Sequence, residues 1–464
     1  MARIYPFRAL RYDTSKVKME DVVTQPYDKI TPAMQQAYYD RSKYNLIRVI
    51  LGKREPDDTD AFAPDAASTP QHNVYTRAAE SLTSWRKKAI LREEAEPALY
   101  GYSQTYTVPG TDEVRERRGF IALGQLYDYA DKVVYRHEQT FPKHKSDRLA
   151  LFKATRAYCE QIYMLYSDPA FTAEKLIFDN GSQADLSITD EYDVVHRVWR
   201  LTDPHLINLI VTAMADKKLI IADGHHRYET SVTYMKERAA ELGQAAAATT
   251  TDEDDESPSN RAEEPHSLLP KPAFPEAAMM MTFVNMDAPG ITILPTHRVL
   301  FGLKDFNTQA FLARAEEFFE ITPVATPDLE PLRTSAGVAF IAVTADGNHL
   351  LTAKPEAMAK TLADLGVSPR QAALDVVQLH TIVLERLLDL THESIAGVEN
   401  IRYLREATEA VEQVRTGSAD IAFLIRPVTL DQLRDISLSG DVMPQKSTDF
   451  FPKLLSGLAI YALD

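Results

Sequence analysis

Apolar residues recur along this chain at the spacings of both strands and helices. Residues 98–107 and 117–127 have the pattern of two antiparallel strands, and the apolar run at 218–222 is typical of a buried strand. Residues 75–92 and 204–215 have the spacing of amphipathic helices. Further strands are expected at 45–51, 163–166, 278–285, 337–344 and 420–426, and further helices at 31–40, 146–162, 309–319 and 371–390. This order of elements predicts an α/β fold of the mixed α+β kind.

One segment breaks the pattern. Residues 241–273 have no apolar periodicity and are rich in acidic residues, Ser and Pro. Because such a segment has too little apolar surface to bury, we expect a disordered insertion there. We predict three regions: an N-terminal α/β region at 1–130, a central core at 131–300 that carries the insertion, and a C-terminal α/β region at 301–464.

The charge balance limits the expected partners. The chain has 51 Lys and Arg residues against 67 Asp and Glu residues, a net charge of −16. This argues against a protein whose whole surface binds nucleic acid. A local basic site is still compatible with it, since a small anion needs only a few well-aimed donors. The expected partners are therefore small molecules.

The N-terminus and the cysteine content indicate the compartment. Residues 1–13 include Arg and Asp where a signal peptide has an apolar run, and no stretch is apolar enough for a membrane span. We therefore expect a cytoplasmic protein without a membrane partner. The single cysteine, Cys159, excludes a disulfide within the chain and a Cys-based zinc site. Its apolar surroundings predict a buried packing residue.

The most informative segment has the sequence LIIADGHHRYET. The predicted buried strand ends at Asp223, and Gly224 allows a tight turn. The next helix has His225, His226 and Arg227 in its first turn. A helix N-terminus attracts anions through its N–H groups and its dipole, and cationic side chains there favour a phosphate site. The alternative is an Asp N-cap followed by polar surface residues.

A second polar segment has the sequence YRHEQTFPKHKSDR. Glu138 suits a general base for a hydroxyl proton, and His137 beside it is a second candidate catalytic residue. Lys143, Lys145 and Arg148 are candidate ligands for a polyphosphate. The alternative is a solvated charged loop.

Two further segments offer candidate phosphate donors. His297 and Arg298 follow Pro-Thr and form a compact pair, with an exposed turn as the alternative. Lys446, followed by Ser and Thr, is a candidate for phosphate contact or for capping a helix. His380 and His392 lie in a helical region and at its end, where we expect packing or surface roles and not metal binding.

Taken in order, several motifs resemble the bacterial family catalogued as domain of unknown function 1015. They are PFRALRYD, VVTQPYDKIT, YNLIRVILG, RHEQTFPKHKSDRLAL, LYSDP, IADGHHRYET, ILPTHR and MPQKSTDFFPKL. Together they span nearly the whole chain. That family is loosely linked to the chromosome-partitioning protein ParB through its DGHHR segment. The resemblance implies a core similar to the ParB/sulfiredoxin fold, with large N- and C-terminal elaborations.

The same fold includes free L-serine kinases, which carry an HE pair upstream of a DGHHR segment. The resemblance implies Glu138 as the base, residues 225–227 as phosphate ligands, and Mg²⁺ with ATP or ADP as the donor, pyrophosphate being an alternative. Asp223 is the rival base and a candidate Mg²⁺ ligand. The expected product is O-phospho-L-serine. Sulfiredoxin chemistry is disfavoured because His225 stands where the reactive Cys would be.

Two other functions stay open. A ParB-like, nucleotide-dependent DNA-binding protein would need a basic face and a helix-turn-helix. A sensor of a phosphorylated metabolite would need the anion site but not Glu138.

Overall fold

The chain forms two compact units. The computed structural model describes residues 2–63, 65–140, 142–179, 181–243 and 268–464, except for the side chains of 142–144 and 396. Unit 1 contains Met1–Tyr135, Pro142–Ile291 and Pro452–Asp464, and unit 2 contains Arg136–Phe141 and Thr292–Phe451. The unit boundaries differ from the boundaries predicted at 130 and 300, because the predicted N-terminal region and most of the predicted core lie together in unit 1.

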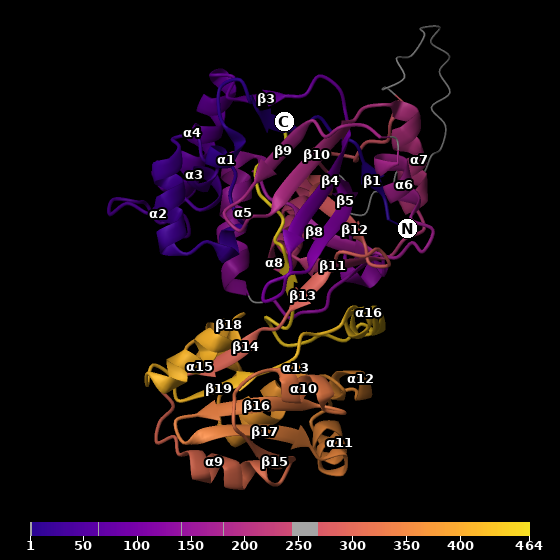
Figure 1. Ribbon diagram of the computed structural model, residues 1–464. Coiled ribbons are helices and arrows are strands. Elements are labelled where there is room, and N and C mark those ends of the chain that lie inside the picture. Colours follow the sequence, from indigo (N-terminus) through magenta and orange to yellow (C-terminus); the bar gives the residue numbers. More distant parts are fainter. Residues whose placement is uncertain (1, 64, 141, 180, 244–267) are drawn as a thin grey trace, which may run out of the picture. The chain divides into compact units, whose positions relative to one another are not determined.

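Unit 1 is built on a nine-stranded mixed sheet (Figure 1). Its strands are β1 Ile4–Tyr5, β4 Leu99–Thr107, β5 Val114–Gln125, β6 Val134–Tyr135, β8 Ile162–Tyr166, β9 Leu186–Thr189, β10 Val195–Leu201, β11 Leu219–Asp223 and β12 Ala278–Asn285. Their order is β6-β11-β8-β12-β5-β4-β10-β9, with β1 beside β5. The predicted antiparallel pair β4 and β5 is confirmed. β11 runs parallel to β6 and antiparallel to β8.

Helices flank this sheet and short strand pairs complete the unit. The helices are α1 Met19–Val22, α2 Pro32–Arg41, α3 Ile47–Ile50, α4 Val74–Lys87, α5 Pro142–Thr155, α6 Thr172–Phe178, α7 Pro204–Met214 and α8 His225–Glu241. The pairs are β2 Leu10–Tyr12 with β3 Leu91–Glu93, and β7 Ala157–Tyr158 with β21 Tyr461–Ala462. In Figure 1, α2, α3 and α4 lie at one side of the sheet and α6 and α7 at the other.

Two predicted elements of unit 1 are corrected. The strand predicted at 45–51 is the short helix α3, whose start is fixed by Asn45 Oδ1 accepting a hydrogen bond from Ile47 N at 2.9 Å. A short buried helix and a buried strand have the same apolar run, so periodicity does not separate them. The helix predicted at 146–162 begins earlier and ends at Thr155, because Arg156 adopts a left-handed φ of 49°.

Unit 2 has its own six-stranded sheet. Its strands are β14 His297–Leu300, β15 Phe319–Val324, β16 Ala339–Thr344, β17 Gly347–Ala353, β18 Ile401–Leu404 and β19 Ile421–Leu424, in the order β15-β17-β16-β19-β14-β18. A separate pair joins β13 Thr292–Leu294 to β20 Asp449–Phe451. The helices are α9 Thr308–Ala315, α10 Glu330–Thr334, α11 Pro355–Asp364, α12 Pro369–Ala372, α13 Asp375–Gln378, the π-helix η5 Leu379–Leu387, α14 His392–Gly397, α15 Ala407–Arg415 and α16 Leu430–Ser439.

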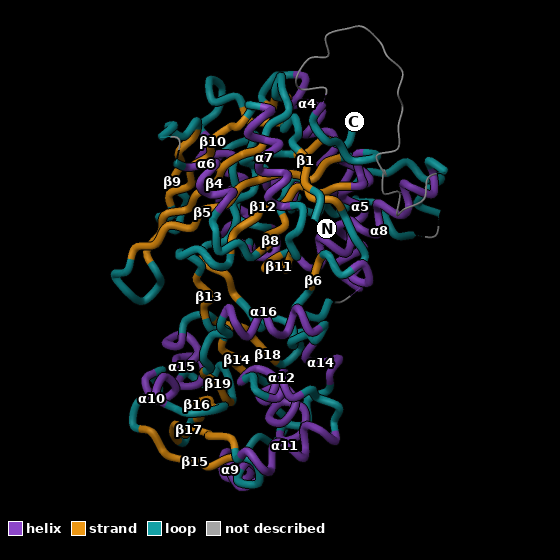
Figure 2. The backbone as a smooth tube through the Cα atoms, turned by 90° about the vertical axis from the view of Figure 1, so that its right-hand side faces the viewer, coloured by secondary structure: helices purple, strands orange, loops and turns teal. Residues whose placement is uncertain are grey.

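The strands β16 and β19 of the unit 2 sheet are buried on both faces. Along β16, Ile341 and Val343 pack in one apolar core with Val411 of α15. The alternate residue Phe340 contacts Phe423 of β19 through its ring. Because side chains alternate along a strand, these contacts lie on opposite faces. Figure 2 shows α10 and α15 on one side of this sheet and α9 on the other.

The predicted insertion is only partly described. Residues 244–267 lie outside the described residues, so the expectation of disorder is not tested there. At the start of the predicted insertion, α8 continues to Glu241, and near its end Leu269 is buried. Packed structure therefore extends further into 241–273 than predicted. Among the described helices, none combines the length and the apolar composition needed to cross a bilayer.

Candidate functional site

The turn between β11 and α8 holds the DGHHR segment. β11 ends at Asp223 and α8 begins at His225. Gly224 between them has a left-handed φ of 97°. A Cβ here would lie 3.0 Å from Ile162 Cδ1 and 3.2 Å from Arg227 Nη2. Both the backbone conformation and the available space therefore favour glycine.

Asp223 lies between two cations. Its Oδ1 accepts a hydrogen bond from Lys453 Nζ at 2.8 Å, and its Oδ2 accepts one from Arg227 Nη2 at 2.8 Å. Burial favours the protonated acid, but Lys453 and Arg227 outweigh it and hold the pKa of Asp223 well below its usual value. A carboxylate with so low a pKa is a poor proton acceptor, so these contacts do not fit the role of general base.

Arg227 points into unit 1. Its Nη1 donates to the backbone oxygen of Gln161 at 2.7 Å and lies 3.9 Å from Glu160 Oε1. The buried Arg148 lies on the other side of Glu160, with Nη1 at 3.6 Å from Oε2. Burial lowers the pKa of Arg227, but Glu160 and Asp223 raise it further, so Arg227 stays charged. A chain of alternating charges thus runs from Lys453 through Asp223, Arg227 and Glu160 to Arg148.

These contacts change the predicted roles of two arginines. Arg227 and Arg148 were expected to bind phosphate with their side chains. Both guanidinium groups are instead engaged inside unit 1, where they neutralise the buried carboxylates of Asp223 and Glu160. A buried charge must be paired, and this pairing accounts for the two arginines.

The first turn of α8 remains the candidate phosphate site. His225 is buried and His226 is partly exposed. Gly224 is the N-cap and makes no side-chain capping bond. The N-terminus of this 17-residue helix therefore brings backbone N–H groups and the positive end of the dipole to the end of β11. Lys453 adds a positive charge next to Asp223. Phosphate binding at 224–226 stays a prediction that this geometry fits.

Two residues of this cluster were missed by the sequence analysis. Lys453 is 230 residues from Asp223 along the chain. The one sequence feature that could have indicated Lys453 is its position as the last residue of the MPQKSTDFFPK segment. Glu160 follows Cys159, which is buried as expected, and nothing in the local pattern marks it as the partner of two arginines.

Glu138 belongs to unit 2 and is held by a tight turn. Its Oε1 accepts hydrogen bonds from Ser447 N at 3.0 Å, Thr448 N at 3.1 Å and Thr448 Oγ1 at 3.1 Å. Lys446 adopts a left-handed φ of 57°, which aims the next two N–H groups at the same point, as in an anion-binding nest. Among the described residues, none donates a hydrogen bond to Oε2 of Glu138. Glu138 thus has one fixed oxygen and one available for a proton.

His137 supports the same turn. It is fully buried, and its Nε2 lies 2.9 Å from Thr448 Oγ1. Its Nε2 also lies 3.8 Å from Glu138 Oε1. These contacts fit a residue that positions Glu138, and the catalytic role predicted for His137 finds no exposed imidazole to support it.

His297 and Arg298 are not in an exposed turn. Both lie in β14 and both are fully buried. His297 Nδ1 accepts a hydrogen bond from Ile425 N at 3.2 Å. Arg298 donates to the backbone oxygen of Lys446 at 3.1 Å and to that of Thr296. The alternative of an exposed turn is wrong for this pair, and the phosphate contact stays a prediction that the burial of both side chains does not favour.

The described contacts of the remaining lysines, which were predicted to bind phosphate, involve other groups of the protein. Lys145 forms an ion pair with Glu229 of α8 in unit 1. The side chain of Lys143 lies outside the described residues. Lys446 is exposed, and its recorded hydrogen bond is made by its backbone oxygen, not by its ammonium group.

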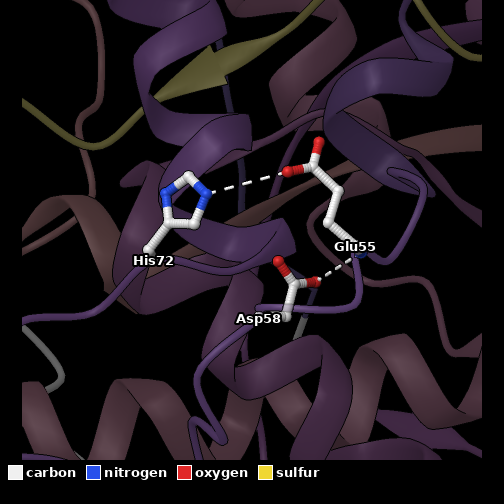
Figure 3. Close-up of side chains that lie close together, drawn as sticks. All are labelled: Glu55, Asp58 and His72. Atoms are coloured by element: carbon white, nitrogen blue, oxygen red, sulfur yellow. Dashed lines mark hydrogen bonds and ion pairs between the residues drawn. The ribbon is translucent and has the colours of Figure 1, made fainter.

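A separate polar cluster joins Glu55, Asp58 and His72 (Figure 3). Their ligand atoms lie within 4.8 Å of one another, the spacing of a metal site. Arg77 occupies this cluster, with Nη1 at 2.5 Å from Asp58 Oδ1 and Nη2 at 3.1 Å from Oδ2. The hydrogen bonds from Arg77 lower the pKa of Asp58 to about 2. A guanidinium already neutralises this carboxylate, so the cluster fits a loop anchor better than a metal site.

Residues 4–377 match the model of a family described as "Protein of unknown function (DUF1015)". No curated protein matches the chain.

Solved structures similar to this chain include a free serine kinase in complex with AMP. The identity is 12% and the TM-score 0.32, with 72% of this chain and 86% of that chain covered. A conserved hypothetical protein from Pyrococcus furiosus matches at 12% identity and a TM-score of 0.33, covering 72% and 92%. SbnI from Staphylococcus aureus, with a C-terminal truncation, matches at 13% identity and a TM-score of 0.34, covering 72% and 85%.

Proposed function

The chain belongs to the DUF1015 family, whose model matches most of its length, and from that premise we propose that it is a small-molecule kinase. In the proposed reaction, the terminal phosphoryl group of ATP or ADP moves to the hydroxyl oxygen of free L-serine, giving O-phospho-L-serine. The bond from the terminal phosphorus to the bridging nucleotide oxygen breaks. A phosphorus–oxygen bond to serine forms, and a base takes the hydroxyl proton. Pyrophosphate is an alternative donor.

The observation that carries the proposal is the turn from β11 into α8. A phosphate at the N-terminus of α8 is stabilised by the backbone N–H groups and the dipole of the helix. His226 is partly exposed in the first turn of the same helix. Asp223 does not repel the phosphate strongly, because Lys453 and Arg227 neutralise it.

We propose Glu138 as the base because contacts within unit 2 hold its carboxylate in a fixed position. Three donors converge on its Oε1, so the carboxylate cannot rotate without breaking them. A fixed carboxylate keeps Oε2 in one place, which lowers the entropic cost of proton transfer. In this proposal the serine hydroxyl proton goes to Oε2.

Asp223 does not fit a Mg²⁺ ligand. Each of its oxygens already accepts a hydrogen bond from a cationic side chain. A divalent cation at Asp223 would face the charges of Lys453 and Arg227 within a few ångströms. In the proposal Mg²⁺ enters as part of the nucleotide substrate, bound to its phosphates.

The test is a direct assay of turnover. Full-length protein is incubated with Mg²⁺, L-serine and each of ATP, ADP and pyrophosphate, and the products are identified by ³¹P NMR and mass spectrometry. O-phospho-L-serine with at least one donor is the expected result. If nucleotide binds but no hydroxylated metabolite is phosphorylated, the kinase proposal fails and the sensor function is supported.

The role of Glu138 is tested by Glu138→Gln. The amide keeps the shape but accepts no proton, so we expect kcat to fall by about 10²–10⁴-fold with little change in nucleotide affinity. Glu409→Gln, an exposed residue of α15, is the matched control and should keep full turnover. Full turnover of Glu138→Gln would show that another group is the base.

A further inference from the structure

Unit 2 contains a cavity of about 200 Å³ that no residue of the proposed reaction lines. Its walls come from α12, α13, η5, α14, the segment before Lys446 and Gln139. The polar side chains that matter here are His380, Glu385 and His392. Val377 and Ile395 give it an apolar side. A small concave pocket with an apolar side and a few polar groups is the usual form of a metabolite site.

The helix beside this cavity has an unusual backbone. η5 is a π-helix over Leu379–Leu387, and near its end Leu388 N donates to Val383 O, five residues earlier. On an α-helix, residues five apart point roughly 140° away from each other. A helix closed by bonds from residue i to i+5 brings them near the same side. His380 and Glu385, five residues apart, both line the cavity for this reason.

His380 offers the cavity a buried donor. Its side chain is almost fully buried, and its Nε2 accepts a hydrogen bond from Arg298 Nε at 3.2 Å. A neutral imidazole that accepts at Nε2 carries its proton on Nδ1. Among the described residues, none accepts a hydrogen bond from this Nδ1–H. A donor that lines a cavity and is used by no described side chain suits a ligand with an acceptor atom.

The charges around the cavity have opposite signs at its two ends. Arg298, behind His380, forms no ion pair with a carboxylate among the described residues, and its recorded hydrogen bonds go to two backbone oxygens and His380. Glu385 supplies a carboxylate, with His392 Nδ1 at 3.7 Å from its Oε1. One end therefore suits an anion and the other suits a cation.

We propose that this cavity binds a small free α-amino acid. The ligand carboxylate accepts the hydrogen bond from His380 Nδ1–H, close to the charge of Arg298. The ligand ammonium group donates to Glu385, and its Cα and side chain lie against Val377 and Ile395. Neither Glu138 nor any of residues 446–448 lines this cavity, although Gln139 and Gln445 are their neighbours in the sequence. The amino-acid site does not depend on the proposed kinase reaction.

Calorimetry of the full-length protein without nucleotide tests the site. Glycine, L-alanine and L-serine are the probes, and acetate and methylammonium carry only one of the two charges. We expect at least one amino acid to bind with a Kd below about 1 mM, at least tenfold more tightly than acetate or methylammonium. Absence of amino-acid binding, or equal binding of acetate, would overturn the proposal.

Variants then locate the ligand. Glu385→Gln should weaken binding at least tenfold, whereas Glu393→Gln, an exposed neighbour in α14, should leave it unchanged. His380→Asn keeps an N–H donor near the position of Nδ1 and should retain more affinity than His380→Leu. If the His380 variants fail to fold, Glu385→Gln decides by itself. Binding that survives Glu385→Gln but is lost in Glu138→Gln would place the ligand elsewhere and overturn the proposal.

Discussion

The carboxylate of Asp223 lies between Lys453 and Arg227, and these three side chains are largely shielded from water. Such pairs are costly to break on one side only, because the remaining charge is left buried. Lys453 is thus needed for the stability of unit 1 whatever ligand the site binds. In unit 2, Arg298 is buried with backbone oxygens and His380 as its hydrogen-bond partners, and burial lowers its pKa to about 10.

Lys453→Met should destabilise unit 1 by about 3 kcal/mol, the low end for breaking a buried pair, because Asp223 is 20% exposed. Both tryptophans, Trp85 and Trp199, lie in unit 1, so urea unfolding followed by tryptophan fluorescence reports this unit. Lys236→Met removes an exposed ion pair with Asp128 and should cost well under 1 kcal/mol. Equal effects of the two substitutions would contradict the pairing.

In Lys453→Met, Asp223 keeps Arg227 as its one cationic partner. The double variant Asp223→Asn with Lys453→Met should recover part of the loss, because the under-compensated carboxylate is gone and Arg227 still has Glu160. The pH dependence has a defined sign. The pKa of Asp223 is lowered on folding, so its stabilisation is complete above the unfolded carboxyl pKa of about 3.9 and is lost as the pH falls below it.

A second prediction at this scale concerns His297, which is fully buried in β14. Burial, with a smaller effect of Arg298, lowers its pKa to about 4. Between about pH 6.5 and 4 the unfolded chain binds a proton that the folded chain does not, so stability falls as the pH is lowered. Through His297, the free energy of unfolding should fall by about 2 kcal/mol when the pH is lowered from 7 to 5. His380 acts in the same direction, because burial also lowers its pKa.

His297→Asn removes the titration and keeps an acceptor for Ile425 N. Hydrogen exchange of β14 peptides, corrected for intrinsic exchange rates, should then show a weaker loss of stability at pH 5 than in the unchanged protein. The same loss in both proteins would show that His297 does not titrate in this window.

At the scale of elements, the turn at 446–448 has a strained backbone and holds the candidate base Glu138. Lys446 is in the left-handed region, where a non-glycine residue costs roughly 1–2 kcal/mol. Its backbone oxygen accepts from Arg298, and the two N–H groups that follow bind Glu138. The conformation at 446, and not the ammonium group, is what the described contacts use.

Lys446→Gly should therefore keep the turn and raise stability by up to about 1 kcal/mol, whereas Lys446→Val should lower it by about 1–2 kcal/mol. Thermal unfolding measures the stability difference, and nucleotide titration of both variants measures the role of the side chain. A tenfold loss of nucleotide affinity in Lys446→Gly would show that the ammonium group binds phosphate, as the sequence suggested.

At the scale of the whole molecule, the chain leaves unit 1 and returns to it. Residues 292–451 belong to unit 2, and Pro452–Asp464 completes unit 1. This last segment supplies Lys453 and the strand β21, and Leu455, Leu458 and Leu463 are buried. Unit 1 therefore cannot form its complete core until the last residues of the chain are present.

Truncation after Phe451 should prevent unit 1 from folding. Each buried leucine contributes about 1.5–3 kcal/mol, and the segment's sum approaches or exceeds the 5–15 kcal/mol that usually stabilises a domain. We expect tryptophan fluorescence of the truncated chain to resemble that of the unfolded protein. Native-like fluorescence with cooperative unfolding would contradict this. Deletion of Asp464 alone, which is exposed, is the control.

The sequence alone determined those structural features that depend on residues close to one another along the chain. The strand–glycine–helix turn at 219–230, the antiparallel pair β4 and β5 and the helix α7 follow from local sequence patterns, and the structure confirms them. The helix α3 was mistaken for a strand because its run of buried apolar residues carries no period.

Only the tertiary structure decided how the polar residues are used. Asp223 meets Lys453 from 230 residues away, and Glu138 meets Ser447 from 309 residues away. Arg227 and Arg298 are cationic in the sequence, but their burial follows from strands and helices that are distant in the chain. A charged residue has the same local pattern whether it faces solvent, a ligand or a buried partner. The choice among these depends on long-range packing, because removing a charge from water requires a partner that only the fold brings near.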